Sequence, residues 1–327
     1  GRRKAAAVTG RDIVTLDFDT IPPYGTDGVI QTLENMKCGY CVYSTRKHMP
    51  TAPRLRILLP LDRTVTVDEY EPIARWIAAQ IGIQMADPTT FEPSRLMYWP
   101  SCSSDGEYIF RYADAPLISA DAVLNTYTDW HDCISWPQVP GANNKYRTLA
   151  AKQGDPLEKP GVVGAFCKMC DEHGGISYAM EQFLPGIYEV VDNSQDRYTY
   201  LGGSTTGGAI TYDNEKFLYS HHATDPCSGR LVNAFDLVRL HKFGEQDDEV
   251  KEGTPLNRLP SYKEMCEFAS EDKETASIML KDRHNQAMKD FEGVGAADDS
   301  DNTEWMQKLQ FNSQTGAVLT NIDNVKI

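Results

Sequence analysis

The chain has 327 residues, of which 41% are hydrophobic, and its formal net charge is −15. This length is sufficient for two or three domains with buried cores, and the acidic balance excludes a protein that coats nucleic acid along its whole length. The charge is uneven, because residues 1–66 hold 10 Lys and Arg against 6 Asp and Glu, whereas residues 245–305 hold 7 against 17. The N-terminal part can therefore still present a basic surface to phosphate groups.

The sequence predicts neither a membrane span nor a secretory signal. No run of 18 apolar residues occurs, and the basic N-terminus is not followed by the apolar stretch of a signal peptide. Eight cysteines without such a signal suit a reducing compartment. We expect a protein of the cytoplasm, without a membrane partner. Because the chain starts at Gly1 and ends at Ile327 without a terminating pattern, we also expect it to be part of a longer protein.

The first 60 residues predict alternating strands and helices. Apolar and β-branched patterns indicate strands over residues 11–19, 40–45 and 54–59, with Pro60 closing the last, and a short helix over 29–36. A basic, proline-bearing loop joins the second and third strands.

A longer helix follows, from a capping box at Thr66 and Glu69 to Gly82. After an irregular segment, residues 108–112 predict a strand and 120–127 a helix. These elements indicate an α/β catalytic domain over residues 1–140.

The rest of the chain predicts four segments of different character. Residues 141–160 are rich in Pro, Gly, Asn and Lys, as in a linker. Residues 161–186 hold two short helical patterns, 187–245 form a β-rich module closed by a helix, and 246–327 are acidic and partly helical. The fold class expected for the whole chain is α/β.

Two aspartates define the candidate site. Asp17 and Asp19 lie one residue apart in the first predicted strand, so that both side chains should project from one face. Two carboxylates forced together repel each other, and a divalent cation such as Mg²⁺ or Mn²⁺ relieves the repulsion. The alternative is a strand end whose aspartates cap the next turn.

A third carboxylate and a set of cations follow the pair. Asp87 comes after the predicted helix and before a proline, where it is either a further metal ligand or the start of an Asp-Pro turn. Cationic side chains and an imidazole that can grip a polyphosphate surround these acids in the sequence. They are Arg46, Lys47, His48, Arg54, Arg56 and Arg95.

In this order the motifs resemble the archaeo-eukaryotic primase superfamily, and above all the phage and prophage primase-polymerases of the virulence-associated protein E family. Residues 161–167, 220–229 and 233–238 resemble the segments that follow the catalytic domain in such proteins, and 305–327 the lead-in to their helicase domain. The catalytic resemblance rests on Leu16-Asp17-Phe18-Asp19, Tyr43-Ser44-Thr45-Arg46-Lys47-His48, Pro53-Arg54-Leu55-Arg56-Ile57, Asp87, and Pro93-Ser94-Arg95-Leu96-Met97-Tyr98-Trp99-Pro100-Ser101.

The resemblance implies an RRM-like catalytic core that joins nucleoside triphosphates on a single-stranded DNA template. Asp17, Asp19 and Asp87 would bind two Mg²⁺ or Mn²⁺ ions, and His48 would contact the phosphates of the incoming nucleotide. The family often has a small hydroxyl residue two positions before this histidine, where the present chain has Arg46. That departure affects the loop and not the histidine itself. The resemblance also implies a helicase partner in the same longer chain or as a separate protein, in a bacterial host cell.

Two other functions are compatible with the same residues. The chain could be a non-catalytic module that recruits a helicase through its acidic segment, or a metal-dependent nuclease that uses the same carboxylates. No P-loop occurs, so helicase activity would need a separate domain.

Three further motifs receive structural interpretations. The pairs Cys38/Cys41 and Cys167/Cys170 are predicted to be buried thiols, because a zinc site shared across so long a separation is improbable. The segment around His221-His222, Asp225 and Cys227 suggests a metal site or a nickase motif, but the two histidines lack the one-residue spacing of the nickase pattern, so a structural role in a β-turn is predicted instead. Tyr98 and Trp99 either stack on bases or pack in the core.

Overall fold

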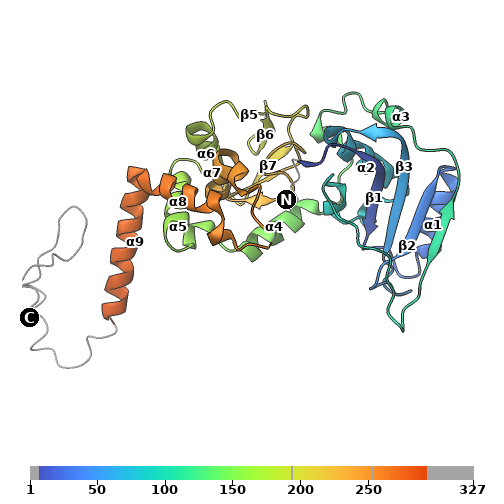
Figure 1. The fold of residues 1–327 in the computed structure, drawn as a ribbon, viewed down its shortest axis with the longest axis horizontal. Helices are drawn as coiled ribbons and strands as arrows, with labels where there is room; N and C mark the ends of the chain where they lie inside the picture. The colour runs from blue at the N-terminus through green and yellow to red at the C-terminus, as the bar shows by residue number, and fades with distance from the viewer. Residues whose placement is uncertain (1–6, 193, 252, 293–327) are drawn as a thin grey trace, which may run out of the picture.

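A computed structural model describes residues 7–192, 194–251 and 253–292, and these residues form two antiparallel sheets with helices against them (Figure 1). The four-stranded sheet is N-terminal and has the order β1-β3-β2-β4. The five-stranded sheet follows the chain order from β5 to β9. The α/β fold class is thereby confirmed.

The N-terminal sheet begins with the order expected of an RRM-like core, β1-α1-β2-β3-α2. Its final strand differs from that arrangement, because β4 pairs with β2 rather than with β1. The elements are β1 (Arg11–Phe18), α1 (Thr26–Asn35), β2 (Tyr40–Ser44), β3 (Leu55–Val65), α2 (Val67–Ile81), β4 (Phe110–Ala113) and α3 (Ala120–Leu124).

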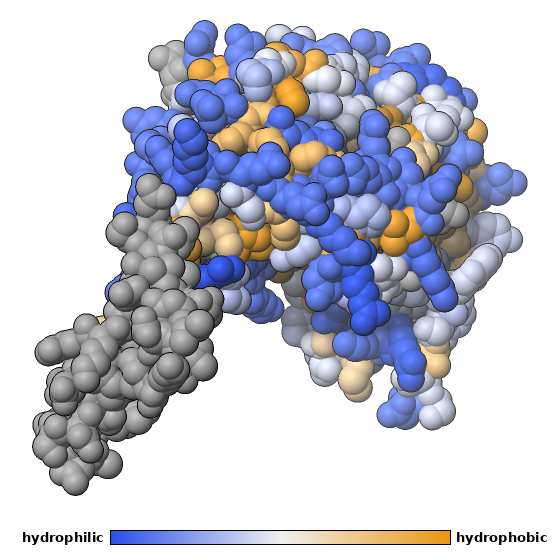
Figure 2. All heavy atoms as spheres, turned by 60° about the vertical axis from the view of Figure 1, so that its left-hand side comes forward, coloured by the Kyte–Doolittle hydropathy of each residue, from blue (hydrophilic) through white to orange (hydrophobic). Residues whose placement is uncertain are grey.

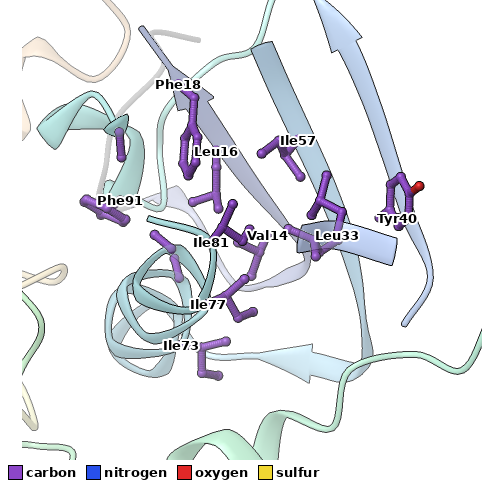
Figure 3. Close-up of a cluster of buried hydrophobic side chains, with 14 of the residues drawn as sticks. Val14, Leu16, Phe18, Leu33, Tyr40, Ile57, Ile73, Ile77, Ile81 and Phe91 are labelled. Atoms are coloured by element: carbon purple, nitrogen blue, oxygen red, sulfur yellow. The ribbon is translucent and has the colours of Figure 1, made fainter. Parts of the chain in front are cut away.

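Alternation along β1 separates a core face from an open face. Val14, Leu16 and Phe18 are fully buried and point toward α2, as Figure 3 shows. The helix contributes its own apolar stripe, with Ile73 and Ile77 fully buried. The side chains between them on β1 project from the opposite face of the sheet, which carries Asp17.

The predicted capping box begins α2. The Thr66 side chain accepts from the backbone N–H of Glu69 at 3.3 Å, and the Glu69 carboxylate accepts from the Thr66 N–H at 2.7 Å. Gly82 ends the helix with φ 134°, a conformation that favours glycine. The predicted boundaries of this helix are confirmed.

Pro60 does not close the third strand, contrary to the sequence prediction. The strand β3 continues to Val65 and pairs with β1 beyond the proline. β2 pairs with β3 only as far as Leu58. Beyond that point the Pro60 carbonyl accepts from the N–H of Ile118 at 3.2 Å, on the side away from β1, so the missing N–H of Pro60 removes no hydrogen bond from the ladder with β1.

The segment predicted to be a linker contains a helix, α4 (Ala142–Gln153). Its Tyr146 is 2% exposed and packs with Tyr212 and Tyr219 of the second sheet. This aromatic cluster buries one side of the helix. The composition of residues 141–160 predicted a linker because the polar residues of this segment lie on a helix that the rest of the protein covers only in part.

The C-terminal part combines the second sheet with helices that cover it. The sequence patterns at 162–170, 176–183 and 234–243 correspond to α5, α6 and α7, and the segment 261–292 to two consecutive helices. The elements are α5 (Val162–Glu172), α6 (Ile176–Phe183), β5 (Tyr188–Val190), β6 (Arg197–Tyr200), β7 (Ala209–Tyr212), β8 (Phe217–Ser220), β9 (Leu231–Val232), α7 (Ala234–Phe243), α8 (Pro260–Glu271) and α9 (Lys273–Glu292).

The surface seen in Figure 2 is mostly hydrophilic, with separate hydrophobic patches. Within the described ranges, no helix is both long and apolar enough to cross a bilayer. The lead-in to a helicase domain that the sequence predicts at 305–327 lies outside the described residues.

Two glycines offer a matched test of the packing. Gly164 lies inside α5, where an added Cβ would collide with the carbonyl oxygen of Lys159, whereas a Cβ at Gly28 in α1 would meet nothing within 4 Å. We expect Gly164→Ala to lower the free energy of unfolding by about 1–3 kcal/mol, and Gly28→Ala to raise it by about 0.5–1 kcal/mol because alanine favours the helix. Urea denaturation measures both, and equal effects of the two substitutions would contradict the packing of α5 described here.

Candidate functional site

The third predicted carboxylate lies beside the first two because the chain returns to the edge of β1 after α2. Ala86 forms a β-bridge with Phe18, and the backbone N–H of Asp87 donates to the carbonyl of Asp17 at 2.8 Å. The N–H of Asp19 donates to the carbonyl of Met85 at 3.0 Å. These backbone contacts join residues about 70 positions apart and bring Asp87 next to both acids of β1.

The buried side chain of Thr90 completes this junction. Its hydroxyl accepts from the backbone N–H of Asp17 at 2.9 Å and donates to the carbonyl of Thr15 at 3.1 Å. Thr90 thus satisfies the edge groups of β1 as a neighbouring strand would. No pattern in the sequence indicates this role, since a threonine after an Asp-Pro turn is common.

Each of the three carboxylates faces an arginine. Arg54 lies 3.0 Å from Asp19, Arg56 lies 3.5 Å from Asp17, and Arg95 lies 3.7 Å from Asp87. Arg54 and Arg56 thus both reach acids at the end of the neighbouring strand β1. The distances join side-chain nitrogen to carboxylate oxygen. The residues predicted to bind metal and those predicted to bind phosphate therefore meet in one site and neutralise each other.

Of the three acids, Asp17 has the environment that most favours the binding of a further cation. Burial raises its pKa, the Arg56 guanidinium opposes that rise, and the charges of Asp19 and Asp87 add to it. Its Oδ1 is buried and has no hydrogen-bond partner. An unpaired buried carboxylate oxygen next to two like charges fits a site for a divalent cation.

The three carboxylates are nevertheless spread more widely than the ligands of one ion. In the described part of the chain, they do not form a group with all ligand oxygens within 4.8 Å of one another. Asp87 also caps a 3-10 turn, since its Oδ1 accepts from the N–H and the hydroxyl of Thr89 at 3.0 Å each. The turn-forming alternative for Asp87 is therefore present in the structure, together with its position beside the pair.

The imidazole of His48 is 2% exposed and is held by the backbone of the neighbouring strand. Its Nδ1 accepts from the N–H of Arg54 at 3.1 Å, and its Nε2 is buried without a hydrogen-bond partner. Arg54 in turn pairs with Asp19, which links the imidazole to the acidic cluster. The flanking side chains of Arg46 and Lys47 are exposed, and the structure records no contact between either of them and the three acids.

The open face of the sheet joins this acidic end to an aromatic region. Asp17, Arg56, Tyr43 and Phe110 are successive partners across the four strands. Farther along the same face, a groove of about 510 Å³ is lined by mainly apolar side chains. They include Ile13, Cys41, Leu58, Phe110, Tyr112 and Leu117.

Tyr98 and Trp99 are 76% and 90% exposed, which excludes the interpretation that they pack in the core. The carbonyl of Tyr98 accepts from the Tyr43 hydroxyl at 3.1 Å and from the Arg56 guanidinium at 2.9 Å. The backbone of this segment is thus anchored beside the acidic centre while both rings face solvent. Tyr43 belongs to one of the motifs quoted from the sequence, but the sequence assigned it no role of its own.

The second sheet contacts the N-terminal domain a few residues after Asp87. The Tyr219 hydroxyl donates to Glu92 Oε1 at 3.1 Å, and His221 Nδ1 lies 3.1 Å from Glu71 Oε1. Burial raises the pKa of Glu92 to about 7, although the Tyr219 hydroxyl and the charge of Arg95 act in the opposite direction. The contact between the two sheets therefore includes a carboxyl group that titrates near neutrality.

The geometry describes an α/β domain with three carboxylates, three arginines and a histidine gathered at one end of an open sheet face. A comparison with protein families found that residues 1–139 match the VapE N-terminal domain. This part of the chain is therefore similar to the VapE N-terminal domain family, and the similarity indicates a phage-type replication module. Searches of curated proteins and of solved structures found no significant match.

The titration of Glu92 predicts a pH dependence of stability. The folded carboxyl holds its proton up to about pH 7, whereas the unfolded one releases it near pH 4.3. Stability contributed by this group is therefore greatest at low pH and falls as the pH rises between these values, by up to about 3 kcal/mol. Urea denaturation at several pH values should show a smaller decrease for Glu92→Gln than for the wild type.

The exposed Glu267 of α8 provides the control. Glu267→Gln should leave the pH profile unchanged. Identical profiles for wild type and Glu92→Gln would show that the buried carboxyl does not titrate in this range.

Proposed function

We propose that the N-terminal domain is a template-dependent nucleotidyltransferase, a DNA primase-polymerase of phage or mobile-element replication. The observation that carries this proposal is the backbone contact of Asp87 with Asp17, which brings a third carboxylate to the pair on β1. Nucleotidyl transfer needs such a set of acids next to groups that hold phosphates. The match to the VapE N-terminal domain supports the proposal.

Asp17, Asp19 and Asp87 would hold two Mg²⁺ or Mn²⁺ ions. The buried, unpartnered Oδ1 of Asp17 supports this donor set, and carboxylate oxygens are the ligands these ions prefer. When bound, two such metal ions would activate the attacking 3′-oxygen and stabilise the leaving pyrophosphate.

The cations of the site would then act on the nucleoside triphosphate. Arg54, Arg56 and Arg95 neutralise the carboxylates in the ion-free arrangement. With the carboxylates engaged by ions, their guanidinium groups are available to donate to phosphate oxygens. His48 adds an imidazole, because its buried Nε2 has no hydrogen-bond partner, while its Nδ1 lies 3.1 Å from the backbone nitrogen and 3.2 Å from the carbonyl oxygen of Arg54. The exposed Arg46 and Lys47 extend the basic rim.

The open sheet face would bind the single-stranded template. Exposed aromatic rings on which bases can stack lie along it, namely Tyr98, Trp99, Phe110 and Tyr112. The groove, which extends across the sheet from β1 to β4, is continuous with the face that carries Asp17. The template strand is therefore proposed to run from the aromatic region toward the carboxylates.

We further propose that the chain works with a helicase domain, in the same longer protein or as a partner, in the cytoplasm of a bacterial host. A metal-dependent nuclease is the second candidate, because the same carboxylates could activate a water molecule instead of a 3′-oxygen. Pyrophosphate release during DNA synthesis separates the two functions, since hydrolysis of DNA produces none. A recruiting module without catalysis would show neither reaction.

Loss of the acidic pair should abolish synthesis. With template DNA, nucleoside triphosphates and Mn²⁺, we expect Asp17→Ala with Asp19→Ala to reduce product formation by at least about a hundredfold. The reason is that two of the three proposed metal ligands are removed. Labelled-nucleotide incorporation measures the product, and Mn²⁺ titration by calorimetry measures the ions directly.

The double variant Asp12→Ala with Asp105→Ala is the matched control, because it removes two exposed carboxylates of the same domain. It should retain wild-type synthesis and Mn²⁺ binding. Undiminished synthesis by the Asp17 and Asp19 variant would reject the proposed centre.

Removal of exposed aromatic rings should weaken template binding. We expect Trp99→Ala and Tyr112→Ala each to cost about 1–3 kcal/mol in affinity for single-stranded DNA, the usual contribution of one stacked base. Fluorescence anisotropy with a labelled oligonucleotide measures this. Leu256→Ala, which removes an exposed apolar side chain of the C-terminal part, should have no effect, and equal affinities of all three variants would place the template elsewhere.

A further inference from the structure

The C-terminal part contains a cluster of mixed donor groups far from the acidic site. Asp225, Cys227 and His241 each offer one ligand atom, and these atoms all lie within 4.8 Å of one another. In the described part of the chain, this is the one group of three such residues with that spacing. We propose that it is a structural site for a transition metal of the zinc type.

The three residues come from two elements that the fold holds together. Asp225 and Cys227 lie in the loop between β8 and β9, and His241 lies in the last turn of α7. Asp225 and Cys227 are fully buried, and the His241 side chain is 3% exposed. The three side chains would provide three of the four ligands of a tetrahedral ion, and a water molecule would take the fourth position.

Backbone contacts fix the loop so that both of its donors point to the same place. The N–H of Cys227 donates to Asp225 Oδ1 at 2.7 Å, and the N–H of Ser228 donates to the Asp225 carbonyl at 2.8 Å. The N–H of Arg230 donates to the Cys227 carbonyl at 3.1 Å. The spacing of Asp225, Pro226 and Cys227 thus forms a rigid turn that presents an oxygen and a sulfur atom to α7.

The chemistry of the donors selects the class of ion. A thiolate and an imidazole are poor ligands for Mg²⁺ and Ca²⁺ but good ligands for Zn²⁺ and Co²⁺. One carboxylate, one thiolate and one neutral imidazole carry two negative charges, which a divalent ion cancels. The complex is therefore neutral, as a buried site requires. Binding transfers the thiol proton of Cys227 to solvent.

A hydrogen-bonded triad is the competing arrangement for the same residues. The Tyr188 hydroxyl lies 2.8 Å from both Asp225 Oδ2 and His241 Nε2, and Asp225 Oδ1 lies 3.3 Å from His241 Nε2. In the metal-bound form His241 Nε2 would bind the ion in place of these contacts, and Tyr188 would keep its hydrogen bond to Asp225. Such outer hydrogen bonds orient the ligands of metal sites.

The neighbouring histidines are engaged elsewhere, which explains why the sequence motif did not reveal this site. His222 bonds through its ring to Thr205 and to the backbone N–H of Gly208, and His221 contacts Glu71. The histidine of the site is His241, 14 positions after Cys227 on another element.

The test is the metal content of the whole chain. The protein is expressed with added zinc and purified without a chelator or a polyhistidine tag, and its metals are measured by mass spectrometry. We expect about one zinc per chain, and at least a tenfold lower content in Cys227→Ser and in His241→Gln. The control variants Cys102→Ser and His131→Gln, which alter exposed or partly exposed side chains, should keep the ion, as should Asp17→Ala with Asp19→Ala.

A second measurement, made on the wild type, tests the proposal even if the variants fail to fold. Co²⁺ added to zinc-free protein should give the charge-transfer band of a cobalt–thiolate bond together with the visible bands of a tetrahedral ion. Absence of zinc and of this band in the wild type would leave a hydrogen-bonded triad only and overturn the proposal. Zinc retained by folded Cys227→Ser and His241→Gln would equally overturn it by assigning the ion to other residues. Neither result bears on the proposed polymerase centre.

Discussion

The hydrogen bond from the backbone of Asp87 to the carbonyl of Asp17 determines the composition of the candidate site. Without it, the sheet offers two aspartates and their arginine partners, which is a common surface arrangement. With it, the segment after α2 forms a short additional edge on β1, and a third carboxylate enters the same electrostatic environment. The position of this acid is therefore set by backbone pairing and by the Thr90 side chain, both of which are independent of the charges involved.

The arginines explain how a cluster of three acids persists in a folded protein. Each carboxylate has one guanidinium within 4 Å, so the repulsion within the cluster is offset without an ion. Because of the same pairing, metal ions would have to replace the arginines as partners of the carboxylates at the same time as phosphates replaced the carboxylates as partners of the arginines. A site built in this way is matched to a substrate that brings negative charge along with its cations, as a nucleoside triphosphate does.

The first sheet was largely predictable from sequence, because its strands and helices have clear periodicity. The proximity of Asp87 followed from resemblance and not from pattern, since bridge formation between residues 18 and 86 has no local signature. Three features escaped prediction for identifiable reasons. Pro60 lies beyond the end of the ladder between β2 and β3, α4 is polar on its uncovered side, and His241 joins Asp225 through a helix whose pattern shows only its core face. Such outcomes depend on tertiary packing, which a single sequence does not reveal.

The hydrogen bond between Tyr219 and Glu92 connects the second sheet to the first domain. Glu92 ends the same 3-10 turn that begins at Asp87, so that both residues belong to one short rigid unit. The turn that carries Asp87 is thus tied on one side to β1, through the Asp17 carbonyl, and on the other side to the second sheet, through Tyr219. Binding events on the C-terminal half of the chain would therefore have a short covalent route to one acid of the cluster.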